Sequence, residues 1–586
     1  MRGRRSIILG SYETELRAET LEDVRDVLRS AEAAARRGLW VGGFVSYEAA
    51  PAFDPGLAVR CDAAPAVDVP LAWFGLFRSA AATPLKLPHG ARRTDDVEWD
   101  VEMPREEYAL RVKSILDEIE MGNAYQVNLT SHLTSRAAVD SRDLYRRLLH
   151  AQQPAHAALI ELDDVAVVSA SPELFFEWDT TTLRSRPMKG TMRRGRWTVE
   201  DEAKGQELAT SPKDRAENVM IVDLIRNDLS KVARTGSVKV SALCELEAYP
   251  HVWQMVSDVS CTTRDDVGVV DIFDAMFPCG SVTGAPKQSA MGVIASLETA
   301  PRGLYCGAVG LMAPSRSGVR AKFNVAIRTA VIERARGTAS FGSGGGVVAD
   351  SSPEGEYREL VLKSDMLNSP VGQPIRLLET FRYTPGGAND HVDEHLARLR
   401  GSAEFLGFRL RDGLDTYLAS RLVNASESRV RLLLSRNGRL DVQVTVAPDA
   451  PTKPVRLAID DEAVDSQWVM LFHKTTRRGV YTRRRRRHRS VDDVIMVNER
   501  GECTETTTAN IAVLVGSQWL TPALASGCLP GVERARRIKS GELVEARLTP
   551  DDVRSAVAVA VLNSLRGWRD AVVVDLAGRS SSREVN

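Results

Sequence analysis

The sequence predicts an α+β fold in two domains. Strand-like runs and amphipathic helical runs are mixed along the first two-thirds of the chain, without the strict alternation of a βαβ fold. The segment NSPVGQ, residues 368–373, then ends the last helical run with a proline and a glycine, and a strand-like run begins after it. About 210 residues follow, enough for one further domain. We therefore expect a first domain over residues 1–367, a linker over 368–375 and a second domain over 376–580.

The elements of the first domain follow from residue spacing. Helical spacing and strong helix formers predict three helices, at residues 22–37, 108–121 and 216–229. Short apolar or alternating runs predict four strands, at residues 157–162, 165–170, 174–178 and 237–242. We expect Gly42 and Gly43 to break the chain after the first helix, before an aromatic segment.

Composition and charge argue against several classes of protein. Hydrophobic residues make up 43% and charged residues 26% of the 586 residues, as in soluble globular proteins. The net charge of −1 gives no overall attraction to nucleic acid or membrane, and no window approaches the ~18 apolar residues of a membrane span. The basic run Arg483–Arg487 has no interleaved aromatic residues, so we expect a solvated loop rather than a nucleic-acid patch.

The cysteines indicate a reducing compartment. Their number, seven, is odd and no C-x-x-C pair occurs, which argues against a disulfide framework and a structural zinc site. The apolar stretch before Glu13 is too short for the core of a signal peptide. We expect a cytoplasmic enzyme.

Two acidic pairs stand near the starts of predicted helices. Asp214 and Glu217 follow one Ser-Pro pair, and Glu356 and Glu359 follow another; serine suits the N-cap and proline the first helical position. Residues three apart share a helix face. A single such pair is usually a solvated face, but two pairs brought together suit Mg²⁺, which prefers oxygen ligands.

A glycine-rich segment, FGSGGGVVAD, precedes the second acidic pair. We expect its consecutive glycines, Gly344, Gly345 and Gly346, to form a loop whose backbone N–H groups approach an anion closely. The P-loop pattern G-x-x-x-x-G-K-[ST] is absent, so a carboxylate ligand fits as well as a phosphate.

Seven motifs together resemble the chorismate-binding enzymes, a family that includes anthranilate synthase component I, aminodeoxychorismate synthase component I, isochorismate synthases and salicylate synthases. They occur in the family's order: GNAYQVNLT (122–130), SPELFFE (171–177), RPMKGT (186–191), DRAENVMIVDLIRNDL (214–229), FPCGSVTGAPK (277–287), NVAIRT (324–329) and GGGVVADS with EYRE (344–359). The resemblance covers about residues 30–367. It implies an anthranilate synthase component I-like domain of antiparallel sheets with flanking helices.

The resemblance also implies roles for the matching residues. Mg²⁺, which holds the ring carboxylate of chorismate, would be bound by Glu217, Glu356, Glu359 and, at a position where the family often has Glu, Asp214. The residues implied in substrate binding are Thr283, Tyr305, Arg328, Gly344, Gly345 and Gly346, of which Tyr305, Arg328 and the glycine N–H groups would hold the enolpyruvyl carboxylate. His251 matches a proton-transfer histidine of anthranilate synthases; the alternative is a buried structural histidine.

Lys189 separates the reactions of the family. Anthranilate synthases carry Ala at this position, whereas aminodeoxychorismate synthases carry Lys. A neutral lysine amine that attacks C2 of chorismate leaves C4 as the site where ammonia adds, which gives 4-amino-4-deoxychorismate by covalent catalysis. Isochorismate- and salicylate-forming members also carry Lys here, used to activate water, so Lys189 argues against a typical anthranilate synthase more than it selects the amination.

The ammonia needs a source. We find no G-x-C-x-G nucleophile elbow with a downstream His-x-Glu in the sequence. A separate glutamine amidotransferase subunit is the implied partner, and the chain alone should use free ammonium.

The second domain resembles the fold-type IV pyridoxal-phosphate enzymes, an α/β group that includes branched-chain and D-amino-acid aminotransferases and aminodeoxychorismate lyase. The motifs are HLARL (395–399), NERGE with TETT and AN (498–510) and LPGVER (529–534). The resemblance implies a Schiff base on Lys474, a pyridinium partner in Glu505 and possible dimerisation through this domain. It also implies a phosphate site formed by Arg398, Thr506, Thr507, Gly531 and Val532.

The sequence thus predicts a bifunctional enzyme that converts chorismate to 4-amino-4-deoxychorismate and then, by elimination of pyruvate, to 4-aminobenzoate. The alternatives are an isochorismate-, salicylate- or anthranilate-forming enzyme joined to an aminotransferase, and an inactive fusion that acts as a scaffold for the amidotransferase subunit. Pathway context argues for the lyase, but a transaminase on the same fold is its rival.

Overall fold

The computed structural model describes residues 5–63, 65–84, 97–152, 154–249, 252–315, 318–368, 375–386, 391–422, 425–449 and 453–574. The chain divides into two compact units. We call Met1–Arg194 with Lys204–Val371 the N-terminal unit, and Gly195–Ala203 with Gly372–Asn586 the C-terminal unit. Residues 369–374 of the expected linker and residues 575–586 lie outside the described residues.

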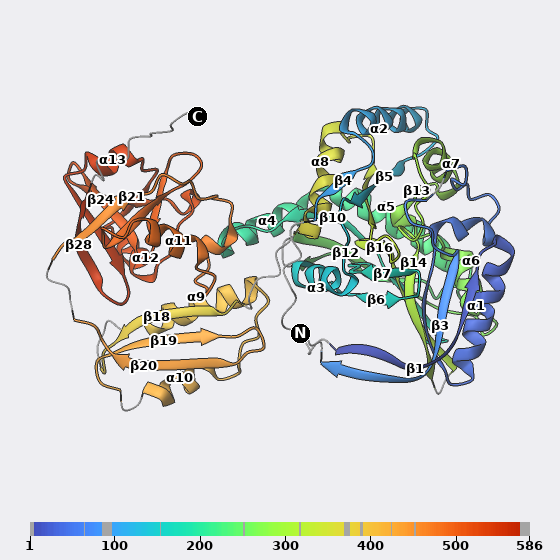
Figure 1. Ribbon diagram of the computed structural model, residues 1–586, viewed down its shortest axis with the longest axis horizontal. Coiled ribbons are helices and arrows are strands. Elements are labelled where there is room, and N and C mark those ends of the chain that lie inside the picture. The colour runs from blue at the N-terminus through green and yellow to red at the C-terminus, as the bar shows by residue number, and fades with distance from the viewer. Residues whose placement is uncertain are drawn as a thin grey trace. The chain divides into compact units, whose positions relative to one another are not determined.

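The N-terminal unit contains two antiparallel sheets (Figure 1). The larger follows the order β1-β3-β2-β14-β15-β8-β9-β12-β10, with β11 beside β12. Its strands are β1 (Arg5–Ala18), β2 (Trp40–Val45), β3 (Ala72–Pro84), β8 (Leu174–Trp178), β9 (Thr182–Arg186), β10 (Met188–Arg193), β11 (Lys239–Ala248), β12 (Val252–Thr262), β14 (Ala308–Ser315) and β15 (Gly318–Val325).

The smaller sheet follows the order β13-β5-β17-β16-β7-β6, with β4 beside β5. Its strands are β4 (Trp99–Val101), β5 (Gln126–Ser135), β6 (Ala158–Glu161), β7 (Val165–Ser169), β13 (Gly284–Ala285), β16 (Thr329–Glu333) and β17 (Ala339–Val347). The α-helices of the unit are α1 (Leu21–Arg36), α2 (Arg105–Glu120), α3 (Ser141–Gln152), α4 (Thr198–Thr210), which begins in the segment assigned to the other unit, α5 (Pro212–Ser230), α6 (Val269–Met276), α7 (Lys287–Leu297) and α8 (Pro353–Ser364).

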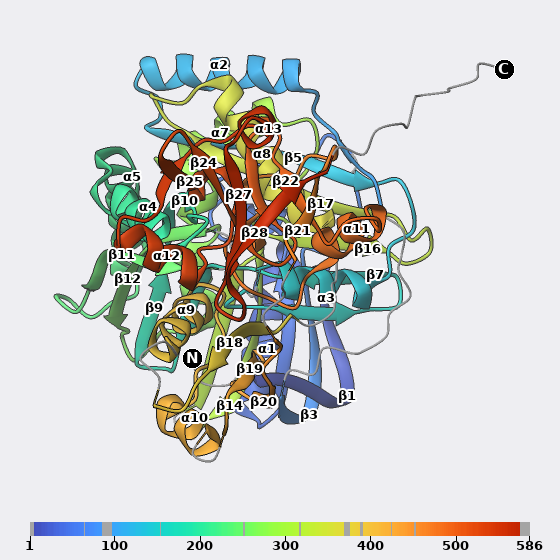
Figure 2. The same cartoon turned by 90° about the vertical axis from the view of Figure 1, so that its left-hand side faces the viewer.

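The helices pack their apolar faces against these sheets and so complete the hydrophobic core of the unit. Helix α1 buries Val24, Leu28 and Ala31 at helical spacing against the larger sheet. Helices α2 and α8 lie side by side in both views (Figures 1 and 2), and their Tyr108 and Tyr357 rings meet edge to face at 5.7 Å. This places the second acidic helix over the smaller sheet, next to β17.

Most of the predicted elements are present. The three predicted helices correspond to α1, α2 and α5, and the first three predicted strands to β6, β7 and β8; the fourth overlaps the start of β11. The expected break at Gly42 and Gly43 is wrong, because both residues lie inside β2. A Cβ atom at Gly43 would lie 1.9 Å from the Trp73 carbonyl oxygen, so glycine serves close strand packing there.

The C-terminal unit contains a three-stranded antiparallel sheet and an eight-stranded mixed sheet. The small sheet comprises β18 (Leu377–Tyr383), β19 (Ser428–Leu434) and β20 (Leu440–Val446), and one of its faces packs on α9 (Val392–Phe405) and α10 (Leu414–Leu422). The large sheet comprises β21 (Val455–Ile459), β22 (Asp493–Val497), β23 (Cys503–Thr506), β24 (Asn510–Val515), β25 (Gln518–Pro522), β26 (Val544–Ala546), β27 (Ala558–Asn563) and β28 (Gly567–Val573). The remaining α-helices are α11 (Gly479–Arg487), α12 (Val532–Lys539) and α13 (Pro550–Arg554).

The basic run Arg483–Arg487 is not the solvated loop that we expected, because it forms the second half of α11. Arg484 is buried, with its side chain 1% exposed, and its Nε lies 2.7 Å from Oδ2 of the buried Asp460. Arg487 also pairs with Asp460, and Arg483 lies 3.1 Å from Glu462. The acidic segment that follows β21 therefore neutralises part of the run and holds the helix to the large sheet.

Candidate active sites

Lys189 lies at a β-bulge in β10. Met188 pairs with Val256 and Thr191 with Gln254, so β10 contains one residue more than β12 between these pairs. Gly190 takes a positive φ of 84°, which favours glycine. The Asn218 amide donates to the Lys189 carbonyl over 3.2 Å, and the Gln254 amide to the Gly190 carbonyl over 2.9 Å. The irregular backbone that presents the lysine is therefore held by both α5 and β12.

The three glycines are part of a strand and not of the loop that we expected. Gly344, Gly345 and Gly346 lie in β17 and pair with Thr130, Leu129 and Asn128 of β5. The pairing of β17 with β16 ends at Phe341, so in the described part of the chain the other edge of this glycine run has no strand partner. The backbone N–H groups of this run that point away from β5 therefore have no strand acceptor in this part of the structure.

The missing Cβ atoms make room for the acidic and basic side chains. A Cβ at Gly346 would lie 2.7 Å from Lys189 Nζ, and one at Gly345 would lie 2.7 Å from Glu356 Oε2. A Cβ at Gly190 would lie 3.2 Å from Asp214 Oδ1. The glycines therefore bring the lysine and the carboxylates to one place at the end of the smaller sheet.

The acidic helices begin as predicted. Ser211 caps α5, where its hydroxyl accepts a hydrogen bond from the Asp214 N–H over 3.3 Å, and the Ser352 hydroxyl accepts one from the Gly355 N–H over 3.2 Å. Within the site, Lys363 pairs with Glu359 at 2.6 Å and also donates to the Gly344 carbonyl over 2.7 Å.

The charges of this site are coupled. Burial lowers the pKa of Lys189; the Glu217 carboxylate opposes this and the Lys363 ammonium adds to it. Burial raises the pKa of Glu217 and of Glu356, whereas the Lys363 ammonium holds the pKa of Glu359 below its usual range. The amine at Lys189 is therefore biased toward the neutral, nucleophilic form.

The predicted carboxylates fit a hard divalent cation. Glu356 Oε2 is buried and has no hydrogen-bond partner in the described part of the structure. Carboxylate oxygens are the ligands that Mg²⁺ prefers, and a cation would compensate both this orphaned atom and the burial of Glu217. The Glu359 charge contributes to the raised pKa of Glu217, so the carboxylates of the two helices lie near each other.

Sequence reasoning missed Glu173. It is 3% exposed, and burial raises its pKa to about 7, against the opposing effects of the Ser281 hydroxyl and the Lys189 ammonium. Its Oε1 atom has no partner among the described residues. A buried carboxyl group with a pKa near 7 suits a general acid. The signal that could have indicated it is its place in the SPELFFE motif, 16 residues before Lys189.

Gln126 is a second residue that the sequence analysis missed. It is fully buried, and both its Nε2 and Oε1 atoms lack a hydrogen-bond partner among the described residues. A Cβ at Gly346 would lie 2.6 Å from Nε2, so this amide is close to the position of the Lys189 amine. An unsatisfied amide at this point indicates a polar ligand.

The predicted substrate residues lie around the same strands. The Tyr305 ring packs under Gly342, where a Cβ would lie 2.1 Å from Cγ, and Arg328 donates to the Lys363 carbonyl. Burial lowers the pKa of Arg328 to about 10, while Tyr305 and Glu359 oppose that shift. Thr283 is buried, and its carbonyl accepts from the N–H of Asn128, the residue opposite Gly346. His251 lies outside the described residues.

Lys474 is the candidate reactive lysine of the C-terminal unit, as Lys189 is of the N-terminal unit. The Leu378 N–H donates to its carbonyl over 2.8 Å, which ties it to β18. Burial, together with the Arg398 and Arg478 charges, lowers the pKa of Lys474 to about 8, although Glu379 opposes the shift. The lysine is therefore prepared to act as a neutral amine.

Glu505 lies close to Lys474. Burial raises its pKa to about 7, and the Tyr481 hydroxyl opposes this by donating to Oε1 over 3.0 Å. The Asn510 amide is 3.4 Å from Oε2. Tyr481 comes from α11, so the helix that contains the arginine run also supplies the partner of Glu505.

Arg398 does not extend freely into the predicted phosphate site. Its Nε and Nη2 atoms donate to Glu379 over 2.9 and 2.6 Å, and Nη1 donates to the Pro530 carbonyl. His395 also bonds to Glu379, over 2.7 Å, and with Arg398 holds the Glu379 pKa at about 2, although burial alone would raise it. Sequence reasoning missed this Glu379 network.

The other predicted phosphate ligands fall into two groups. Gly531 is the N-cap of α12 and Val532 its first residue, so backbone N–H groups at this helix start are placed for an anion. Thr506 and Thr507 instead direct their hydroxyl groups to Asp493.

These residues fit pyridoxal phosphate. A Cβ at Gly531 would lie 2.0 Å from Asn510 Oδ1, so only glycine fits between the helix start and the Asn510 side chain. His395 Nε2 is buried without a partner in the described part of the chain. The set provides an amine, a carboxylate and a helix start, which are the features that bind the aldehyde, the ring nitrogen and the phosphate.

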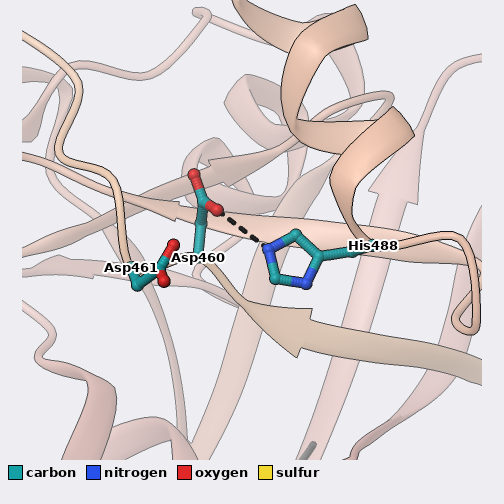
Figure 3. Close-up of side chains that lie close together, drawn as sticks. All are labelled: Asp460, Asp461 and His488. Atoms are coloured by element: carbon teal, nitrogen blue, oxygen red, sulfur yellow. Dashed lines mark hydrogen bonds and ion pairs between the residues drawn. The ribbon is translucent and has the colours of Figure 1, made fainter. Parts of the chain in front are cut away.

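A third cluster of ionisable side chains does not suit a metal ion. Figure 3 shows Asp460, Asp461 and His488, with His488 Nε2 2.9 Å from Asp460 Oδ1. Asp460 also pairs with Arg484 and Arg487, which neutralise its charge. An acidic group already paired with two guanidinium groups is poorly suited to bind a cation.

Comparison with known proteins assigns each of the two regions to a family. Residues 3–369 match the family model of chorismate binding enzymes, and residues 376–573 match that of class IV amino-transferases. The chain is 41% identical over 268 residues to the probable chloroplastic aminodeoxychorismate synthase of Oryza sativa subsp. japonica, an alignment that covers 45% of this chain and 29% of that protein. It is 36% identical over 299 residues to aminodeoxychorismate synthase component 1 of Salmonella typhimurium, with 51% and 63% covered.

The chain thus spans less than two-thirds of the length of either relative. In structure, it is similar to anthranilate synthase component I of Streptococcus pneumoniae, with a TM-score of 0.55, 22% sequence identity and 63% of this chain and 93% of that chain covered. This confirms the predicted fold class for the N-terminal unit, and the second family match confirms it for the region that follows. The chain therefore belongs to the chorismate binding enzymes, and joins that fold to a domain of the class IV amino-transferase type.

Proposed function

We propose that this protein is a bifunctional enzyme of 4-aminobenzoate synthesis. The N-terminal unit would aminate chorismate at C4, and the C-terminal unit would eliminate pyruvate from the product. The observation that carries the proposal is the position of Lys189, a lysine with a lowered pKa on a bulge beside Glu173 and the carboxylates of two helices.

In the N-terminal unit, Glu217, Glu356, Glu359 and Asp214 would hold Mg²⁺, which would supply Lewis-acid stabilisation of the substrate carboxylate. The neutral Lys189 amine forms a bond to C2, both ring double bonds shift by one position, and the C4–O bond breaks. Glu173 donates the proton with which the C4 hydroxyl leaves as water. Ammonia then adds at C4 as the C2–N bond breaks, and a proton from the new amine returns to the site. The net reaction is chorismate plus ammonia to 4-amino-4-deoxychorismate plus water.

Tyr305, Arg328 and the free edge of the glycine strand would orient the enolpyruvyl carboxylate, and Thr283 would line the pocket. Arginine suits a carboxylate because its planar group donates two parallel hydrogen bonds. In this proposal His251 is a candidate proton-transfer group.

In the C-terminal unit, pyridoxal phosphate bound through Lys474, Glu505, Arg398 and the residues at Gly531 and Val532, with Thr506 at the edge of the site, would supply an electron sink. Lys474 would take the proton from C4 of the ring, the C3–O bond would break, and pyruvate would leave as its enol, which makes the ring aromatic. Glu505 would hold the proton on the cofactor's ring nitrogen. A lysine with a pKa of about 8 can accept a proton near neutral pH.

The proposal also includes a partner subunit and a cellular compartment. Ammonia would come from a glutamine amidotransferase subunit, and the C-terminal unit would form a homodimer. The seven cysteines are all free thiols in the structure, which supports a cytoplasmic setting. None of the described helices is long and apolar enough to cross a membrane.

The test is product analysis on purified protein with chorismate, ammonium and Mg²⁺, with and without pyridoxal phosphate. We expect 4-amino-4-deoxychorismate to accumulate without the cofactor and 4-aminobenzoate to form with it. Lys189→Ala should abolish both products, and Lys474→Ala only the second. Salicylate, isochorismate or anthranilate as the main product would overturn the proposal for the N-terminal unit, and transamination without 4-aminobenzoate would overturn it for the C-terminal unit.

A further inference from the structure

The small sheet of the C-terminal unit has one apolar face and one cationic face. Phe381 pairs with Val430, and both belong to the apolar cluster that α9 and α10 complete. On the opposite face, Thr380 pairs with Arg431 and Arg382 with Arg429, because directly paired residues of antiparallel strands share a face. Arg429 and Arg431 thus stand two residues apart on the face away from the helices.

Neither Arg429 nor Arg431 forms an ion pair with a carboxylate of the described residues. Both side chains are half-buried, and the Nε atom of each is buried without an acceptor among the described residues. Arg382, on the same face, differs: it donates to Glu427 and to the Leu565 and Pro448 carbonyls. Buried donors of a charged group without a partner are costly, which indicates that a ligand supplies the acceptor.

Further positive charge surrounds this pair. Burial lowers the pKa of Arg431, and the charges of Arg429, Arg376 and Arg478 lower it further. The carboxylate nearest to Arg376 is Asp441, at 3.4 Å, and Arg439 lies 3.1 Å from the same carboxylate. The cluster therefore carries an excess of cationic groups, which favours an anion.

The cluster lies next to Lys474. The Thr476 N–H donates to the Arg376 carbonyl over 2.9 Å, and the Arg478 N–H donates to the Thr476 carbonyl over 3.0 Å. The charge of Arg478 lowers the pKa of Lys474 as well as that of Arg431. One guanidinium group thus adjoins both the reactive amine and the unpaired arginines.

We propose that Arg429 and Arg431 bind a carboxylate of the substrate that reacts at Lys474, and that they select ring compounds whose carboxylate is remote from the amine. An α-amino acid has its carboxylate on the carbon that bears the amine. 4-Amino-4-deoxychorismate instead has a carboxylate across the ring, at C1, and a second one on the enolpyruvyl group. The identity of this substrate rests on the proposed function, whereas the anion site rests on the arginines themselves.

The experiment is a titration of the full-length protein, loaded with pyridoxal phosphate, with isophthalate, an aromatic dicarboxylate. The visible absorption band of the cofactor reports binding in the C-terminal unit only, and chloride keeps the ionic strength constant. We expect Arg429→Gln and Arg431→Gln each to weaken isophthalate binding by about tenfold, the loss of one charge-assisted hydrogen bond. Arg400→Gln is the matched control, because it removes the same charge from α9, on the other side of the small sheet, where Arg400 pairs with Asp415. Benzoate should bind more weakly than isophthalate.

Equal isophthalate affinity in Arg429→Gln, Arg431→Gln and Arg400→Gln would overturn the anion site, as would equal binding of benzoate and isophthalate. Two arginine variants are used so that the failure of one to fold leaves the other as the test. A second measurement is the KM for 4-amino-4-deoxychorismate, which should rise in Arg431→Gln with a smaller change in kcat. If isophthalate binds as expected but the wild type forms no 4-aminobenzoate, the anion site is supported and the lyase assignment alone fails.

Discussion

A Cβ atom at Gly346 would lie 2.7 Å from Nζ of Lys189, so the glycine strand and the lysine bulge are in direct contact. The groups that such a Cβ would meet, this amine and the Gln126 amide, are the far ends of flexible side chains. Both groups are therefore able to move aside, and the fold can accommodate an added methyl group at Gly346. The movement would, however, displace the Lys189 amine from its position in the site.

We therefore expect Gly346→Ala to fold but to lose most of the amination of chorismate. The added methyl group displaces the Lys189 amine and covers part of the glycine edge. Gly292→Ala, in α7, is the control, because nothing lies within 4 Å of its Cβ position. Thermal unfolding and the rate of 4-amino-4-deoxychorismate formation are the measurements. Wild-type turnover in Gly346→Ala would contradict the assigned position of Lys189.

Glu356→Gln should weaken Mg²⁺ binding by roughly tenfold or more, because it replaces a ligand carboxylate by a neutral amide. Glu354→Gln is the control on the same helix: its carboxylate pairs with Arg105 and Arg358 at the surface. Isothermal titration with Mg²⁺ in the presence of chorismate measures the difference. The metal assignment fails if the two variants have equal affinities.

Glu173→Gln should stabilise the protein while it removes activity. Burial raises the Glu173 pKa from 4.5 to about 7, so the ionised form costs folding free energy. This cost is absent below pH 4.5, grows between pH 4.5 and 7, and is complete above pH 7. At 1.36 kcal/mol per pKa unit it amounts to about 3 kcal/mol. Urea unfolding should show a clearly larger gain at pH 8 than at pH 5.

Glu177→Gln, in strand β8 directly after Glu173, serves as the control for this substitution. We expect Glu177→Gln to leave both the stability at pH 8 and the turnover close to those of the wild type. A stability gain of Glu173→Gln that is the same at both pH values would contradict the raised pKa.

Asp460→Asn should destabilise the C-terminal unit by about 3–5 kcal/mol, because it leaves the buried Arg484 without its carboxylate. Arg483→Gln, in the same run but 64% exposed, should have almost no effect. Urea unfolding followed by loss of the pyridoxal phosphate absorption band reports on this unit. Equal midpoints for the two variants would show that the buried pair contributes nothing.

The reaction of Lys474 with an amine-directed reagent should be half-maximal near pH 8 in protein free of pyridoxal phosphate. Arg478→Gln removes a positive charge beside the lysine and should raise this midpoint, whereas Arg477→Gln, at an exposed neighbouring position, should not. Labelling of the Lys474 peptide as a function of pH, followed by mass spectrometry, gives both midpoints.

The sequence predicted the residues of the sites better than their backbone. Periodicity and capping located α1, α5 and the acidic pairs, because helical spacing and Ser-Pro starts are local signals. Gly344–Gly346 were expected in a loop, since glycine is the usual residue of turns, but long-range pairing with β5 overrides that preference. Glu173 and Gln126 were missed because their burial and their orphaned atoms depend on contacts with distant strands.

The arginine run illustrates the same limit. Five consecutive arginines have no apolar periodicity, so a helix with a buried member was not predictable from α11 alone. The helix depends on Asp460, which lies 24 residues earlier in the chain than Arg484. Only the folded chain brings the two together.

The extra residue in β10 determines on which side of the strand the Lys189 amine lies. If Gly190 were deleted, β10 and β12 would have equal lengths between their two registered pairs, and Lys189 would stand directly opposite Met255, toward Asp214. The composition of the site would be unchanged, yet the amine would no longer lie beside Gly346. A one-residue deletion can thus abolish the reaction of the Lys189 amine, although every catalytic side chain remains in the sequence.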